Sequence, residues 1–150
     1  MSVEYKSQFL NQVGVRCFNV PGAGESLAEQ GHLSNAITVP TNAAVVHITG
    51  QVGNRENGEV PSDFREEFLQ VFVNVETVLK AAGVHEGWEA VYKVHFLNLD
   101  NSPERLQEYL ANIKKFCKDS RPTTMAIGAS SIAWTGATIE IFVEAVKKAS

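Results

Sequence analysis

An acid and an aromatic side chain share one face of a predicted strand near the C-terminus. Apolar side chains alternate along residues 137–145, and strand side chains point to opposite faces in turn. Ile141 and its neighbours two positions away therefore point to one face, while Glu140 and Phe142 point to the other. A carboxylate beside a large aromatic is unusual on a solvated face. It is typical of a ligand cleft or of a subunit interface, and this strand alone does not decide between them.

A second candidate lies where another predicted strand, residues 43–49, ends in Gly50 and Gln51. Glycine at a strand end allows the close approach of a ligand or of a neighbouring backbone. A plain turn glycine explains this stretch equally well.

Other residue types that carry chemistry fit structural roles better. His95 lies in an apolar strand with no second histidine or cysteine at matching spacing, which favours a packed histidine over a ligand or base. Cys17 and Cys117 lack metal-ligand spacing and indicate buried thiols. Gly22 and Gly24 lack the strand-to-helix context of a phosphate-binding loop, which leaves an ordinary loop. The sequence therefore predicts no metal site.

Two helices and a central strand must position these residues. Apolar residues three and four apart from 64 to 82 predict an amphipathic helix that Ser62 caps and Gly83 ends. Residues 90–98 are apolar on both faces, which predicts a central strand. Pro103 begins a second amphipathic helix.

The remaining strands are predicted to form two hairpins. Residues 36–39 and 43–49 flank a Pro-Thr-Asn turn, and residues 121–132 and 137–145 flank a turn that contains glycine. Both pairs are close in sequence, so we expect each to be antiparallel.

The order of elements predicts an α+β fold, with a mixed sheet and two helices packed on one of its faces. Right-handed crossovers place both helices on the same face. No third long helix remains to cover the other face, so we expect a homo-oligomer that packs sheet against sheet. We predict one domain over residues 1–150, with residues 1–14 peripheral.

Charge and hydropathy limit the partners and the compartment. A formal net charge of −4 gives no attraction for phosphate backbones, which makes nucleic acid an unfavourable partner. No apolar run approaches the ~18 residues of a membrane span. The first residues lack the order of a secretory signal, so we predict a cytoplasmic protein and leave a mitochondrial location open.

Several segments between residues 34 and 146 resemble the YjgF/Rid family in order and spacing. The matching segments are Thr49-Gly50-Gln51, the helix with Gln70 and Asn74-Val75 that leads to Leu79-Lys80-Ala81-Ala82-Gly83, Tyr92-Lys93-Val94-His95-Phe96-Leu97-Asn98-Leu99-Asp100, and Pro122-Thr123-Thr124 through Gly136-Ala137-Thr138-Ile139-Glu140-Ile141. The resemblance implies a chorismate-mutase-like fold and a homotrimer whose sheets form a central barrel, with ligand clefts between subunits. It also implies hydrolysis of 2-imino acids, which arise from the enamines that pyridoxal-phosphate enzymes release, to 2-keto acids and ammonia, without a metal or cofactor.

The resemblance also implies which residues form the cleft. A substrate carboxylate is best held by an arginine in a bidentate pair, and an acid can position the attacking water and carry protons. Glu140 matches the acid of the family, and Gly50, Gln51 and Thr124 are expected to line the cleft. Arg121 either replaces the arginine of the family or is a solvated surface residue.

The chain departs from the family at the carboxylate-binding positions. Thr124 stands where the family has its arginine, Leu33 where it often has an aromatic residue, and Phe142 where it has a second glutamate. Losing a hydrogen bond to a charged group costs about 1.5–3 kcal/mol. The standard activity is therefore disfavoured.

Three functions remain as hypotheses. The first is an imine or enamine deaminase with altered specificity for its small-molecule substrate. The second is a non-catalytic ligand-binding or regulatory trimer, which the substituted carboxylate-binding positions favour. The third, a ribonuclease or translation inhibitor, is the least favoured because the acidic chain has no basic and aromatic stripe.

Overall fold

The strands form two separate sheets in the computed structural model, which describes residues 1–149. An antiparallel sheet near the N-terminus has the order β1-β2-β3, with β1 (Val3–Tyr5), β2 (Arg16–Asn19) and β3 (Ala36–Thr38). A mixed sheet has the order β4-β7-β5-β6, with β4 (Ala44–His47), β5 (Val91–Asn98), β6 (Thr123–Gly128) and β7 (Ile139–Lys147). The strand predicted to be central, β5, lies between β7 and β6, which confirms that prediction.

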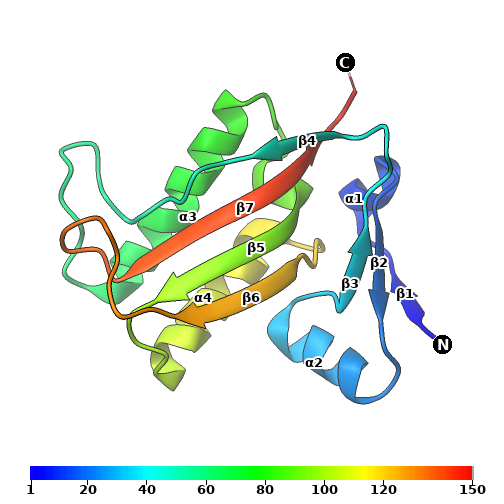
Figure 1. Cartoon of the computed structure of the whole chain (residues 1–150), viewed down its shortest axis with the longest axis horizontal. Helices are drawn as coiled ribbons and strands as arrows, with labels where there is room; N and C mark the ends of the chain where they lie inside the picture. The colour runs from blue at the N-terminus through cyan, green and yellow to red at the C-terminus, as the bar shows by residue number, and fades with distance from the viewer. Residues whose placement is uncertain (150) are drawn as a thin grey trace.

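Two long helices pack on one face of the mixed sheet (Figure 1). The helices are α3 (Phe64–Ala81) and α4 (Pro103–Cys117), while α1 (Gln8–Gln12), α2 (Ala23–Gly31) and the 3-10 turn η1 (Gly87–Ala90) are shorter. Asp63, rather than the predicted Ser62, caps α3 by accepting the backbone N–H groups of Arg65 and Glu66. The long helices and their shared face were predicted correctly.

The predicted hairpin between residues 121–132 and 137–145 is wrong, because β5 lies between β6 and β7. The chain reaches β6 through α4, and a strand that follows such a crossover pairs in parallel with the strand before it. β6 accordingly pairs in parallel with β5, while β7 pairs antiparallel with the other edge of β5. The connection between β6 and β7 is long enough to pass from one edge of β5 to the other.

The second predicted hairpin is also wrong, since its two strands belong to different sheets. β3 pairs with β2, where Ile37 lies opposite Cys17, and β4 pairs with β7. A turn between them, closed by the Ala43 N–H donating to the Pro40 carbonyl at 3.0 Å, redirects the chain. Alternation alone did not distinguish a hairpin from a bend between two sheets.

The N-terminal part of the chain contributes more than the sequence suggested. Residues 1–14 were expected to be peripheral, but Phe9 and Leu10 are buried in the main core. The glycine-containing stretch expected to be a loop begins α2 at Ala23 instead. Gly22 allows this start because its φ of 80° is a conformation that other residues avoid.

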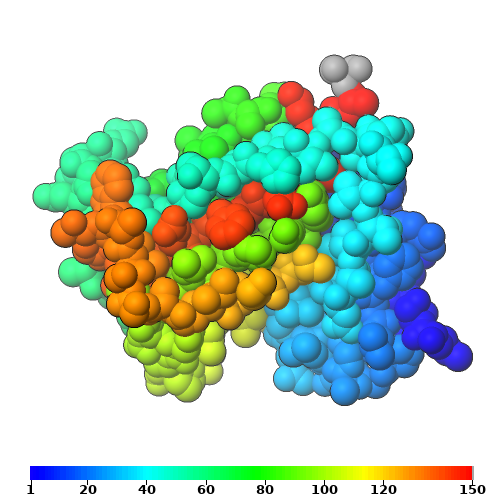
Figure 2. Space-filling model, in the orientation of Figure 1, coloured from blue at the N-terminus to red at the C-terminus, as the bar shows by residue number. Residues whose placement is uncertain are grey.

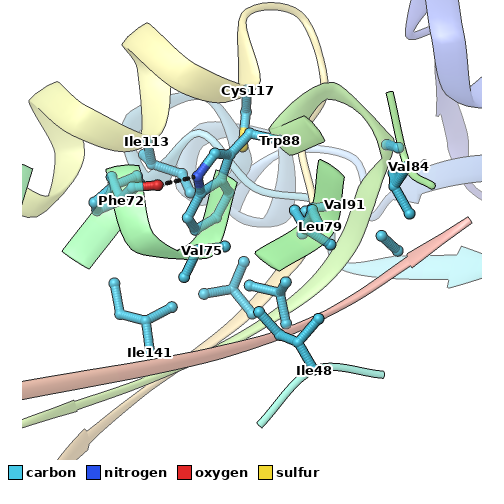
Figure 3. Close-up of a cluster of buried hydrophobic side chains, with 14 of the residues drawn as sticks. Ile48, Phe72, Val75, Leu79, Val84, Trp88, Val91, Ile113, Cys117 and Ile141 are labelled. Carbon is cyan, nitrogen blue, oxygen red and sulfur yellow. Dashed lines mark hydrogen bonds between the residues drawn. The ribbon is translucent and has the colours of Figure 1, made fainter. Parts of the chain in front are cut away.

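Phe72 and Trp88 lie among aliphatic side chains in the core between α3, α4 and η1 (Figure 3). Trp88 is fully buried and stacks on Phe72, with ring centroids 4.5 Å apart. Its indole N–H donates to the Phe72 carbonyl at 2.9 Å, so the indole is both packed and hydrogen-bonded. Cys17 and Cys117 are buried free thiols, as predicted, and burial raises the pKa of both.

The opposite face of the mixed sheet carries no helix in the part of the chain that the structure describes (Figures 1 and 2). Along β7 buried residues alternate with half-buried ones, and Glu140 and Phe142 are half-buried. The predicted parity of this strand is therefore confirmed. We call the helix-free side the open face. No helix within residues 1–149 is both long and apolar enough to cross a membrane.

Candidate functional site

Glu140 lies directly against Gly50 at one end of the open face. A Cβ on residue 50 would come within 2.0 Å of Glu140 Oε1, so any side chain at this position would displace the carboxylate from its present place. Gln51 fixes the contact by exchanging two backbone hydrogen bonds with Ile141, at 2.8 and 2.9 Å. The structure therefore brings together three of the predicted site residues: Gly50, Gln51 and Glu140.

Apolar and aromatic side chains surround Glu140 on the open face. Leu97 lies directly opposite it on β5, and His95 lies opposite Phe142. The His95 and Phe142 rings meet edge to face, with centroids 4.4 Å apart, so His95 is a packed residue as predicted. Glu140 takes part in no ion pair within residues 1–149.

A second glutamate, Glu67, holds the start of β7 from the helix side. Its side chain is 1% exposed. One carboxylate oxygen accepts the backbone N–H of Thr138 at 2.7 Å and that of Ile139 at 3.3 Å, and the other accepts the Thr138 hydroxyl. Sequence reasoning assigned Glu67 no role, because an acid one turn into a helix usually serves the helix dipole.

Arg105 completes this buried network. Its guanidinium donates to the Thr138 hydroxyl oxygen and, at 3.2 Å, to the side-chain oxygen of Asn98. The Thr138 hydroxyl thus connects the cation of Arg105 with the carboxylate of Glu67. Both charged groups are buried with hydrogen-bond partners, as buried charges require.

Thr124 lies on the opposite side of the sheet from Glu140 within the same chain. It pairs with Val94, a core residue, and its hydroxyl lies beside the phenol of Tyr109 on α4. Glu140, in contrast, shares a face with Leu97 and Ile127. One chain therefore does not bring Thr124 and Glu140 together.

Arg121 lies at the far end of the sheet from Glu140. It precedes β6, whose first residue lies opposite Lys93, whereas Glu140 lies opposite Leu97 near the other end of β5. The guanidinium carbon lies 4.2 Å from the centre of the Tyr5 ring, and the Arg121 carbonyl accepts the hydroxyl of Ser34. Arg121 thereby joins the N-terminal sheet to β6.

A polar cluster that the sequence did not indicate occupies the other end of the open face. Glu144 accepts the Tyr92 hydroxyl at 2.6 Å and the Lys93 ammonium at 3.1 Å, and its carboxylate lies 3.6 Å from His47 Nδ1. Burial opposes ionisation of Glu144, but these donors hold its pKa below the ordinary value of 4.5. Burial and the Glu144 carboxylate raise the pKa of Tyr92 above its usual range. A β-bulge between Val91 and Lys93 aligns the donors.

Within residues 1–149, no three histidine, cysteine or acidic side chains come together in a way that could hold a metal ion. The chemistry available at the Glu140 end of the open face is that of a carboxylate next to a glycine backbone. Such a group can bind a hydrogen-bond donor or move a proton.

Fold and site together define an α+β protein of the chorismate-mutase-like class, with helices packed on a mixed sheet. The family model described as endoribonuclease L-PSP matches residues 24–147, and the chain belongs to this family, which is the YjgF/Rid family that its sequence resembles.

Relatives agree with this assignment. A RutC family protein of Aquifex aeolicus is 30% identical over 103 residues, which cover 67% of this chain and 78% of that protein. The structure is similar to that of YyfB, a protein of unknown function of the conserved Rid family from Yersinia pestis, with a TM-score of 0.76 and 26% identity over 88% of this chain and 98% of the other. It is also similar to the protein YjgH, with a TM-score of 0.59 and 28% identity over 83% and 91% of the two chains.

Proposed function

We propose that this protein is a homotrimer whose intersubunit clefts bind a small molecule and hydrolyse an imine or enamine. The observation that carries this proposal is the contact between the Glu140 carboxylate and Gly50 on the open face. A half-buried acid without an ionic partner among residues 1–149 is suited to act on a ligand.

The open face supports the trimer. Half-buried apolar side chains such as Phe142 and Leu97 occupy this face without a covering element in the described part of the chain. Three such sheets closing into a barrel would cover them. In that arrangement the β6 edge of one protomer, which carries Thr124, would lie near the β4 edge of the next and close the cleft around Glu140.

The surroundings of Glu140 favour a substrate without strong carboxylate recognition. Within one chain, Arg105 is engaged with Thr138 and Asn98 on the helix side, Lys93 is paired with Glu144, and the Arg121 guanidinium packs on Tyr5. Leu97 and Phe142 instead offer apolar contacts. We therefore propose an altered specificity, for an uncharged imine or enamine.

Glu140 would act as the proton carrier in this reaction. Its carboxylate accepts a proton from a water molecule as the water oxygen bonds to the imine carbon, and passes this proton to the imine nitrogen, which gives a carbinolamine. Glu140 then accepts the proton of the carbinolamine hydroxyl and donates it to the departing nitrogen, so that the carbon–nitrogen bond breaks and ammonia and a carbonyl compound are released. No metal or cofactor takes part in these steps.

The test measures ammonia release from a freshly generated uncharged imine and from 2-aminoacrylate, with the wild type and the Glu140→Gln variant. We expect turnover of the uncharged imine above background, which Glu140→Gln lowers by about 10²- to 10⁴-fold. Sedimentation equilibrium gives the mass of the assembly. Turnover equal in both proteins, or a monomer at all concentrations, would contradict the proposal.

A non-catalytic ligand-binding trimer is the second candidate, and the position of Thr124 favours it. Its hydroxyl lies beside Tyr109 and cannot form the charge-assisted pair that an imino acid requires. Saturable binding of small molecules without turnover would support this candidate. We do not propose ribonuclease activity, because a net charge of −4 does not attract a phosphate backbone.

A further inference from the structure

We infer that Glu67 is the positioning residue of the Glu140 site, because its buried side chain holds the two segments that meet there in one fixed arrangement. The first segment is the start of β7, which carries Glu140, and the second is the stretch after β4 that carries Gly50. This inference rests on the proposed function of Glu140, but its test does not require turnover.

The Glu67 carboxylate makes hydrogen bonds to the start of β7. It accepts the backbone N–H groups of Thr138 and Ile139, which immediately precede Glu140 in the chain. Two backbone bonds and the Thr138 hydroxyl determine the direction in which the strand leaves the preceding turn. Since side chains alternate along a strand, this direction also determines where Glu140 points.

The contact with the Gly50 segment is made through Gly53. A Cβ on residue 53 would lie 2.6 Å from Glu67 Cγ and 2.8 Å from the Glu67 carbonyl oxygen. The backbone at 53 is therefore packed directly on Glu67. Gln51, two residues earlier, is bonded to Ile141, so the stretch from Gly50 to Gly53 is fixed at both ends.

The charge of Glu67 is compensated without a direct ion pair. Arg105 donates to the Thr138 hydroxyl oxygen, and the same hydroxyl donates to Glu67, so Thr138 lies between the two charges. The Asn98 side-chain oxygen accepts a hydrogen bond from Arg105 Nε, which anchors the network to the end of β5. Such a fully bonded network has one low-energy arrangement and therefore restricts the geometry of the site.

The experiment follows the Glu140–Gly50 contact by NMR of the intact protein. In the wild type, titration of the Glu140 carboxyl, observed by its carbon resonance, should shift the Gly50 amide resonance. We call this shift of the Gly50 amide resonance the Gly50 response, and we expect it to be lost in Glu67→Ala. In Glu67→Gln we expect it to be partly retained, because the amide oxygen still accepts the two N–H groups but cannot accept the Thr138 hydroxyl in addition. Glu66→Gln, one residue away and exposed, is the matched control and should behave as wild type.

Catalysis provides a second readout of the same variants. If the wild type turns over substrate, Glu67→Ala should lower kcat about 10²-fold with little change in KM, as misplaced catalytic groups do. An inactive wild type with a normal Gly50 response would contradict the proposed function alone. A folded Glu67→Ala protein that keeps the wild-type Gly50 response would overturn the role of Glu67.

A second variant keeps the inference testable if Glu67→Ala does not fold. Thr138→Val keeps the side-chain shape but removes the hydroxyl that joins Arg105 to Glu67. We then expect both Thr138→Val and Glu67→Gln to weaken the Gly50 response. A wild-type response in both would overturn the inference.

Discussion

The Glu140 carboxylate fills the space that a side chain at position 50 would occupy, with Oε1 at 2.0 Å from the place of a Cβ on Gly50. The two residues are separated by ninety positions in the sequence, and the hydrogen bonds between Gln51 and Ile141 bring them together. The acid is therefore held against a backbone segment that can present its own polar groups to the same ligand.

Gly50→Ala should displace the Glu140 carboxylate and lower kcat/KM about 10- to 100-fold. The free energy of unfolding should fall by about 1 kcal/mol or less, since only the end of a flexible side chain must move. Ammonia release and urea unfolding measure the two effects. Gly58→Ala is the control, because a Cβ at position 58 would have no neighbour within 4 Å. Its φ of 87° strains an alanine, so we expect the free energy of unfolding to fall by about 1–2 kcal/mol while activity stays unchanged. Equal activity of Gly50→Ala and wild type would show that the contact has no functional role.

Arg121→Gln should destabilise the protein by about 0.5–2 kcal/mol through loss of the cation–π contact with Tyr5. Activity should not change, because the Arg121 guanidinium packs on the Tyr5 ring and serves that contact. Chemical unfolding and kcat/KM are the measurements. Arg65→Gln, which removes an arginine over Phe64 at an exposed site, should have a smaller effect on stability. A loss of activity in Arg121→Gln would instead assign Arg121 to the ligand site.

Glu144→Gln should reduce stability at neutral pH but have little effect in acid. The pKa of Glu144 is lowered in the folded protein, so its stabilisation is present above the unfolded pKa and is lost as pH falls through the folded value, below 4.5. Unfolding curves from pH 7 to pH 3 for both proteins provide the comparison. Glu56→Gln, in an exposed loop, serves as control. If the wild type and Glu144→Gln still differ in their free energy of unfolding at pH 3, ionisation of Glu144 is not the source of the difference.

Tyr92→Phe tests the same cluster from the donor side. Removing the hydroxyl that donates to Glu144 at 2.6 Å should raise the pKa of the Glu144 carboxyl, which carbon NMR detects directly. The Lys93 ammonium remains in place and should limit the change. An unaltered Glu144 pKa would mean that Lys93 and His47, rather than Tyr92, lower it.

Trp88→Phe should lower the free energy of unfolding by about 1–3 kcal/mol, because it leaves the buried Phe72 carbonyl without its indole donor. Trp88→Ala should cost about 3–5 kcal/mol through the cavity as well. Urea unfolding measures both. Trp134→Phe, at an exposed position, is the matched control and should be close to neutral. Similar costs at positions 88 and 134 would contradict the role given to the buried indole.

Local patterns predicted the parts of the fold that depend on neighbouring residues. The stripe of α3, the proline at the start of α4 and the alternation of β7 each reflect interactions within a few residues. Strand pairing was mispredicted twice, because the partner of a strand depends on the path of the whole chain. Proximity in sequence suggested hairpins, whereas the crossover through α4 placed β5 between β6 and β7.

The sequence by itself determined which residue types were available: Glu140 next to Phe142 on one strand face, Gly50 and Gln51 at a strand end, and a threonine at position 124. Only the tertiary structure decided that Glu140 rests on Gly50, that Thr124 faces the helices and that Arg121 binds Tyr5. Glu67 became visible only in three dimensions. Its hydrogen bonds join residues about seventy positions apart, and no local pattern encodes a contact that packing of a helix on a sheet creates.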